Sequence, residues 1–92
     1  MKIYQSSLFA GKIKKFHKDQ KLILDKEIKN IAANPKIGEE KKGALRGIYL
    51  YKFKIRTQQY LLAYRKIDGN LELITIGSHE NYYKNLKIYL SS

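Results

Sequence analysis

The 92-residue chain contains no cysteine, no tryptophan and a single proline. Without cysteine, neither disulfide bonds nor cysteine-ligated zinc can stabilise the fold, and this composition is compatible with a reducing compartment. No apolar run approaches the roughly 18 residues of a membrane-spanning helix. The polar residues that follow Tyr4 are not typical of a signal peptide. We therefore expect a cytoplasmic protein with no membrane partner.

Disorder is also excluded, because 43% of the residues are hydrophobic and disordered chains are poor in such residues. The length is short even for one domain. We expect a single domain over residues 1–92.

Acidic residues are scarce: 8 Asp and Glu stand against 19 Lys and Arg, a net charge of +11. Residues 41–67 contain no acid at all, and their basic residues are Lys41, Lys42, Arg46, Lys52, Lys54, Arg56, Arg65 and Lys66. A stretch of one sign attracts phosphates through long-range electrostatics. Before residue 41 the lysines alternate with acids, as on a solvated helix face. The middle of the chain is therefore the candidate anion-binding surface.

The first half of the chain has helical periodicity. Residues 2–4 are predicted to form an edge strand. Apolar residues then recur at helical spacing over residues 9–16 and 24–32, and Pro35 ends the pattern. A single helix would be more than twice the average length of about 11–12 residues. We therefore predict a helical hairpin broken near residues 17–19, followed by a loop over residues 35–43.

After the loop the period changes to two. In residues 47–56, the odd positions are apolar and the even positions Lys52, Lys54 and Arg56 are basic, which predicts a strand with one face of each kind. Residues 60–64 are apolar at every position and predict a central strand.

The remaining pattern completes an antiparallel meander. Asp68-Gly69 is a strong hairpin signal and leads into a third strand over residues 71–76, and residues 80–90 have the spacing of a short C-terminal helix. We predict an α+β fold in which an N-terminal helical hairpin packs on one face of an antiparallel β-sheet. The opposite face, which carries the basic strand positions, is expected to stay open.

His79 is the first candidate for chemistry, because it follows the third strand and titrates near cellular pH when unperturbed. Cleavage of RNA by its own 2′-hydroxyl adds negative charge to the phosphate oxygens, which fixed cations stabilise. Lys52, Lys54 and Arg56 could supply these cations and Tyr83 could stack a base. Two simpler alternatives are open. His79 could be only a helix cap or a surface residue, and the basic residues of this strand could serve only to keep a sheet face soluble. No carboxylate pair or glycine-rich loop indicates a metal or a cofactor.

Several segments resemble the RelE/ParE superfamily of toxins from bacterial type II toxin–antitoxin modules, near the RelE/StbE branch. The resemblance covers nearly the whole chain and is most specific over residues 77–86. The matching segments are Gly43-Ala44-Leu45-Arg46-Gly47, Tyr51-Lys52-Phe53-Lys54-Ile55-Arg56, Leu62-Ala63-Tyr64 and Gly77-Ser78-His79-Glu80-Asn81-Tyr82-Tyr83-Lys84-Asn85-Leu86.

This resemblance implies a metal-independent, ribosome-dependent endoribonuclease that cuts messenger RNA and leaves a 2′,3′-cyclic phosphate. Lys52 and Lys54 match lysines that activate the nucleophile and stabilise the transition state in RelE-type toxins. His79 matches the catalytic histidine of YafQ-type toxins, and Tyr83 matches their terminal aromatic residue. Leu61 stands where many active members carry an arginine. Four further basic residues are expected to bind RNA: Arg46, Arg56, Arg65 and Lys84.

Two other functions remain open, because one fold can host several activities. ParE-type toxins poison DNA gyrase and are not nucleases, and a basic domain with an open sheet could bind RNA without cleaving it. The expected partners of the nuclease are the ribosome, messenger RNA and a cognate antitoxin that silences it. The charge of +11 favours an acidic, partly disordered antitoxin that folds on this surface.

Overall fold

The computed structural model describes residues 1–78. The elements, in chain order, are β1 (Ile3–Gln5), α1 (Ser7–Ile13), α2 (Lys18–Ala33), β2 (Glu39–Glu40), the 3-10 helix η1 (Gly43–Leu45), β3 (Tyr49–Ile55), β4 (Gln58–Ile67) and β5 (Asn70–Ser78). The helix predicted for residues 80–90 lies outside the described residues.

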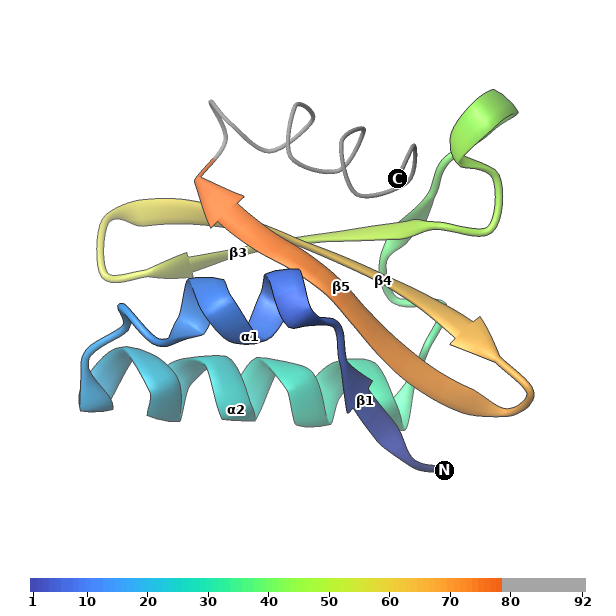
Figure 1. Cartoon of the computed structure of the whole chain (residues 1–92). Coiled ribbons are helices and arrows are strands. Elements are labelled where there is room, and N and C mark those ends of the chain that lie inside the picture. The colour runs from blue at the N-terminus through green and yellow to red at the C-terminus, as the bar shows by residue number, and fades with distance from the viewer. Residues whose placement is uncertain (79–92) are drawn as a thin grey trace.

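The strands form one five-stranded sheet in the order β1-β5-β4-β3-β2 (Figure 1). The predicted meander is confirmed, since β3 pairs antiparallel with β4 and β4 pairs antiparallel with β5. The apolar β4 is central, as expected. β1 is an edge strand that runs parallel to β5. The two-residue β2, which pairs with β3, was not predicted, because its two glutamates carry no strand pattern.

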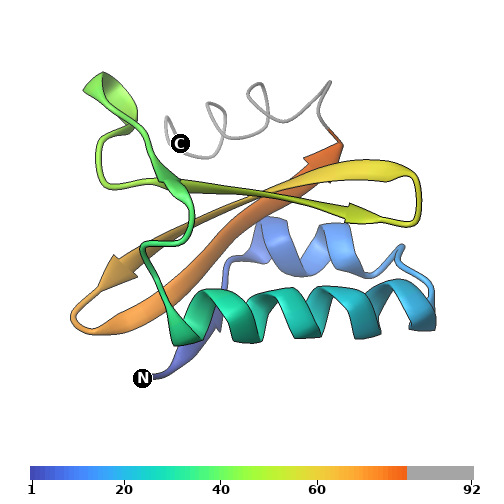
Figure 2. The same ribbon diagram turned by 180° about the vertical axis from the view of Figure 1, so that it is seen from behind.

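The helical hairpin is also confirmed, and both helices lie on the same side of the sheet (Figure 2). α1 begins where the Ser6 hydroxyl oxygen accepts a hydrogen bond from the Phe9 amide at 3.0 Å, as expected of an N-cap. α2 begins after His17, whose backbone amide donates to the Gln20 side chain at 2.7 Å. These two local caps separate one helical pattern into two helices.

The main core fills the space between the helices and the sheet. Phe9 of α1 and Leu24 and Ile31 of α2 pack against one face of the sheet. The sheet residues of this core are Phe53, Ile55, Leu62, Tyr64, Leu71, Leu73 and Ile76. Phe53 and Ile55 are the odd positions of β3, so the alternation expected from the sequence is confirmed.

The opposite face of the sheet, called the outer face below, was expected to be open, and this prediction is wrong. The outer face carries a second buried cluster, the outer cluster, which consists of Ile48, Leu50, Leu61, Ala63 and Ile74, with Leu45 of η1 packed against it. The physical reason is already in β4: a strand that is apolar on both faces requires cover on both faces.

A β-bulge lets β5 contribute to both clusters. Ala63 of β4 is opposite Thr75, but the next β4 residue is opposite Leu73, so Ile74 is the extra residue. Leu73 belongs to the core under the helices and Ile74 to the outer cluster, and with Ile76 the strand returns to the helix side. The bulge thus explains why two apolar residues, Leu73 and Ile74, are adjacent in this strand and yet lie in different clusters.

Tyr64 connects β4 to the chain that leaves α2. Its ring is fully buried, its hydroxyl donates to the Pro35 carbonyl at 2.7 Å, and it accepts from the Gly38 amide at 2.9 Å. Burial raises the pKa of the Tyr64 phenol above its ordinary value. A Cβ on Gly38 would lie only 2.7 Å from the Tyr64 hydroxyl, so this close approach requires glycine.

Substituting Tyr64→Phe is expected to lower the free energy of unfolding by about 1–3 kcal/mol, because two partly buried backbone groups lose their partner. Urea denaturation would measure the change. Tyr60→Phe is the matched control, since the Tyr60 hydroxyl has no hydrogen-bond partner within residues 1–78. Equal stability of the two variants would contradict this assignment.

Candidate nucleic-acid interface

Lys52 and Lys54 project from β3 on the outer face. They alternate with Phe53 and Ile55, which are buried under the helices. Two positions along a strand separate them by about 7 Å. Both lysines are exposed, and neither forms an ion pair with any residue in the described part of the chain. Two neighbouring ammonium groups without an acidic partner favour the approach of an anion.

The sheet register places the end of β5 close to these lysines. Lys52 is opposite Leu61 on β4, and Leu61 is opposite Gly77 on β5. These three residues form a row across the sheet, about 10 Å long at two strand spacings. Ser78, the last described residue, is opposite Tyr60. His79 follows directly in the sequence but lies outside the described residues, as do Tyr83 and Lys84.

Arg56 does not share the face of Lys52 and Lys54, so that prediction is wrong. The residue lies in the turn between β3 and β4 with a φ of 59°, where strand alternation no longer applies. Its guanidinium donates to the Asp19 carboxylate of α2, which is on the helix side of the sheet. Because its guanidinium is paired with Asp19, we do not include Arg56 in the candidate interface.

Arg65 is on the outer face by alternation with Leu61 and Ala63, but its charge is already paired. Its Nε donates to Glu72 Oε1 at 2.6 Å, and Glu72 is the residue directly opposite on β5. Arg46, by contrast, is exposed after η1, with no ion pair to another residue among 1–78. Of the three predicted arginines, Arg46 alone has no ion-pair partner among residues 1–78.

Lys12 is a cation that the sequence analysis did not single out. It lies in the last turn of α1, and its Nζ is 3.9 Å from the position that a Cβ on Gly77 would occupy. Nothing in the local sequence indicates this, because Lys12 precedes the acid-free stretch by some thirty residues. Only the packing of α1 along β5 brings it to the row of Lys52.

The described tyrosines of β3 and β4 are turned away from these lysines. Tyr49, Tyr51 and Tyr60 pack against the core under the helices. The Tyr51 hydroxyl donates to Glu27 at 2.7 Å. Burial is the main cause that raises the pKa of Tyr51, and the Glu27 carboxylate is the second. These three rings are packed on the core and do not face the lysines, so they are not placed to stack on a base bound there.

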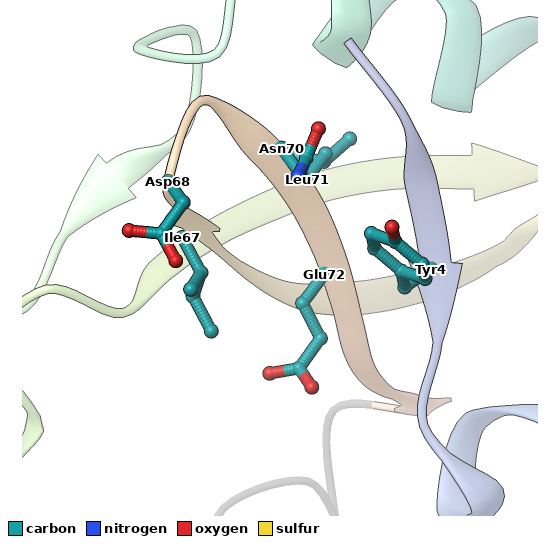
Figure 3. Close-up of a pocket in the computed structure, with 6 residues that line it drawn as sticks. All are labelled: Tyr4, Ile67, Asp68, Asn70, Leu71 and Glu72. Carbon is teal, nitrogen blue, oxygen red and sulfur yellow. The ribbon is translucent and has the colours of Figure 1, made fainter.

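A separate hollow lies at the far end of β5, between β1 and the β4–β5 turn (Figure 3). It has a volume of about 270 Å³, and its lining residues are Tyr4, Ile67, Asp68, Asn70, Leu71 and Glu72. The lining includes two carboxylates and no cation, which is the wrong charge for a phosphate. We therefore do not assign it to the candidate interface.

Within residues 1–78, no three His, Asp or Glu side chains lie close enough together to hold a metal ion. In the same range, neither helix has the length and apolar character needed to cross a bilayer.

Comparison with known proteins identifies the family. A model of the ParE-like toxin of type II bacterial toxin–antitoxin systems matches residues 3–87. The chain belongs to this family. It is a toxin of the RelE/ParE type, as the sequence resemblance implied. No curated protein sequence is significantly similar to the chain.

Solved structures of related toxins share the fold. A free-state mutant of the E. coli toxin RelE superposes with a TM-score of 0.74 at 20% identity, over 98% of this chain and 94% of that chain. A chain of the intact E. coli RelBE toxin–antitoxin complex superposes with a TM-score of 0.69 at 22% identity, over 86% of this chain and 96% of that chain. The YoeB/ParE toxin from Agrobacterium tumefaciens superposes with a TM-score of 0.67 at 20% identity, over 86% of this chain and 99% of that chain. At these identities the likeness concerns the fold, and the predicted α+β class is confirmed.

The salt dependence of RNA affinity is expected to change when the unpaired lysines are substituted, and to stay the same when the paired arginines are substituted. Lys52→Gln/Lys54→Gln should reduce the slope of log affinity against log salt by about 1.4, at roughly 0.7 per lost phosphate contact with a single strand. Filter binding of single-stranded RNA over a salt series would measure the slope.

Arg56→Gln/Arg65→Gln removes the same formal charge and is the matched control, for which we expect an unchanged slope because both guanidinium groups are already paired. A larger loss of slope in this arginine variant would show that the interface lies elsewhere.

Proposed function

We propose that this toxin is an mRNA endoribonuclease that acts on the ribosome and leaves a 2′,3′-cyclic phosphate. The observation that carries the proposal is the pair of exposed lysines on β3, Lys52 and Lys54, with no acidic partner among residues 1–78. A protein that only needed solubility would gain more from mixed charges on this face. Unpaired cations at fixed positions are what a reacting phosphate requires.

In this reaction the 2′-hydroxyl of one nucleotide loses its proton to water and attacks the adjacent phosphorus, and the bond to the 5′-oxygen of the next nucleotide breaks. Negative charge grows on the non-bridging oxygens, where the ammonium groups of Lys52 and Lys54 stabilise it. The departing 5′-oxygen needs a proton. We assign its donation to His79, which follows β5 in the sequence and matches the histidine of related nucleases, because an imidazole exchanges protons near neutral pH.

The proposal makes the chain a cytoplasmic protein, since its substrate is messenger RNA on a ribosome. Residues Arg46 and Lys84 would add contacts to the RNA backbone, which position the strand without reading its sequence.

Gyrase inhibition is the second candidate function, favoured by the ParE-like description of the matching family. Lys52 and Lys54 have no ion-pair partner among residues 1–78, and this favours the nuclease, because a poison that binds a protein surface does not need such a pair of cations.

A translating extract would test the nuclease directly. Mapping of mRNA 5′ ends with the wild-type chain should show cuts that require ribosomes. His79→Ala should lower the cleavage rate by about 10²–10⁴-fold, as expected for the loss of a general acid. Lys52→Gln/Lys54→Gln should also abolish the cuts, while Arg56→Gln keeps them. Intact messages together with inhibition of DNA supercoiling by purified gyrase would replace the nuclease with the gyrase function.

We further propose that a cognate antitoxin neutralises the chain. A toxin of this family acts within a two-protein module, and a net charge of +11 is complementary to an acidic segment that folds as it binds. E. coli RelE, whose fold is similar, has been crystallised in complex with its antitoxin RelB, and the structure of a RelE mutant in complex with a peptide of that antitoxin has also been solved.

Binding of this antitoxin should weaken as salt rises, because screening shortens the range of the attraction between the two chains. Calorimetric titration at low and high salt would measure the change in the dissociation constant. An affinity that does not depend on salt would contradict the electrostatic part of the proposal.

A further inference from the structure

Lys12 is held against the end of β5 by the way α1 starts. The chain passes directly from β1, the parallel partner of β5, into α1. At this junction the Ser6 amide donates to the Leu73 carbonyl at 3.0 Å, and the Ser6 hydroxyl donates to the Ile74 carbonyl. These bonds fix the first turn of α1 on the backbone of β5. Lys12, in the last turn of α1, therefore reaches Gly77 from a defined direction.

The contact with Gly77 places Lys12 at one end of the row whose other end is Lys52. The row passes through Leu61, which is 1% exposed and belongs to the outer cluster. An apolar centre thus separates Lys52 from Gly77 by two strand spacings, or roughly 10 Å along the backbone row, and the Lys12 Nζ lies at the Gly77 end of this row. Cations at the two ends of the row are suited to two different phosphate groups of one strand.

The surroundings of Lys12 also favour an anion. Lys12 is half-buried in a surface hollow of about 400 Å³, whose lining residues are Ser7, Leu8, Gly11, Lys12 and Lys15. The lining includes two amines and no carboxylate, and neither lysine has an ion pair within residues 1–78. The Cβ position of Gly11 has no atom within 4 Å, so space remains open beside Lys12. A partly desolvated ammonium group without a counter-ion binds a phosphate oxygen through a charge-assisted hydrogen bond.

From this geometry we propose that Lys12 binds a backbone phosphate of the RNA next to the one held by Lys52 and Lys54. The inference rests on the proposed nuclease function and extends its substrate contacts from the sheet to α1. The nucleotide chain then runs from the lysines of β3 past the end of β5 towards the hollow beside α1. Because this phosphate is not the reacting one, Lys12 contributes to substrate affinity rather than to the chemical step.

Single-turnover cleavage of mRNA on purified ribosomes would separate these contributions. For Lys12→Gln, we expect the toxin concentration that gives half-maximal rate to rise about tenfold, as for the loss of one hydrogen bond to a charged group, with an unchanged maximal rate. Lys12→Arg should restore the wild-type concentration dependence, because it keeps the positive charge. Circular dichroism melting of each variant would show that the fold is intact.

Lys14→Gln is the matched control, since Lys14 is exposed two positions away, does not line the hollow and carries the same charge. Equal effects of Lys12→Gln and Lys14→Gln, or no effect of Lys12→Gln, would overturn the Lys12 assignment and leave the nuclease standing. A lower maximal rate with unchanged concentration dependence would also overturn it. A wild-type chain that does not cut would overturn the proposed function itself.

Discussion

The burial of β4 on both faces is the constraint on which the rest of the structure depends. Leu62 and Tyr64 point into the core under the helices, and Leu61 and Ala63 into the outer cluster. A strand with this pattern is stable only at the centre of a sheet that is covered on both sides. It therefore fixes β3 and β5 as its neighbours and leaves the margins of the outer face for charged residues.

The charge distribution follows from this arrangement. Asp19 pairs with Arg56 in the turn between β3 and β4, and Glu72 pairs with Arg65 on β4. The lysines of β3 have no such compensation within residues 1–78. Like charges held at fixed positions repel one another, so the free energy of the folded chain falls when an anion binds between them. Electrostatic strain of this kind is typical of a surface that has a ligand.

Most of the fold could be predicted from sequence, because the signals are local. The break near His17, the double apolar face of 60–64 and the Asp68-Gly69 turn each specify a nearby backbone geometry. One error, the expected open outer face, overlooked a signal that the doubly apolar β4 already carries, and the other features that were missed concern relations between distant segments. The position of Arg56 depends on a turn and on Asp19 of a helix, and the two-sided apolar character of β5 depends on a bulge that only pairing with β4 creates.

The candidate site divides in the same way. Lys52 and Lys54 could be found because strand alternation and the missing acids mark them directly. Lys12 could not, since its approach to Gly77 requires α1 to lie along a strand that follows it by more than fifty residues. No periodicity within either segment encodes that contact. Sequence patterns thus identify the cations of one strand, and tertiary structure identifies those that other elements bring to them.

The parallel pairing of β1 with β5 has a consequence for how the protein is made. Ile3 is paired with Leu71, so the first strand finds its place only after almost the whole described chain has been synthesised. Translation delivers the N-terminal residues first, and until β5 emerges they lack the strand that anchors β1 and α1. An interrupted message would therefore yield a chain that cannot close its sheet. For a protein that harms the cell that makes it, this topology delays closure of the sheet until β5 has been synthesised.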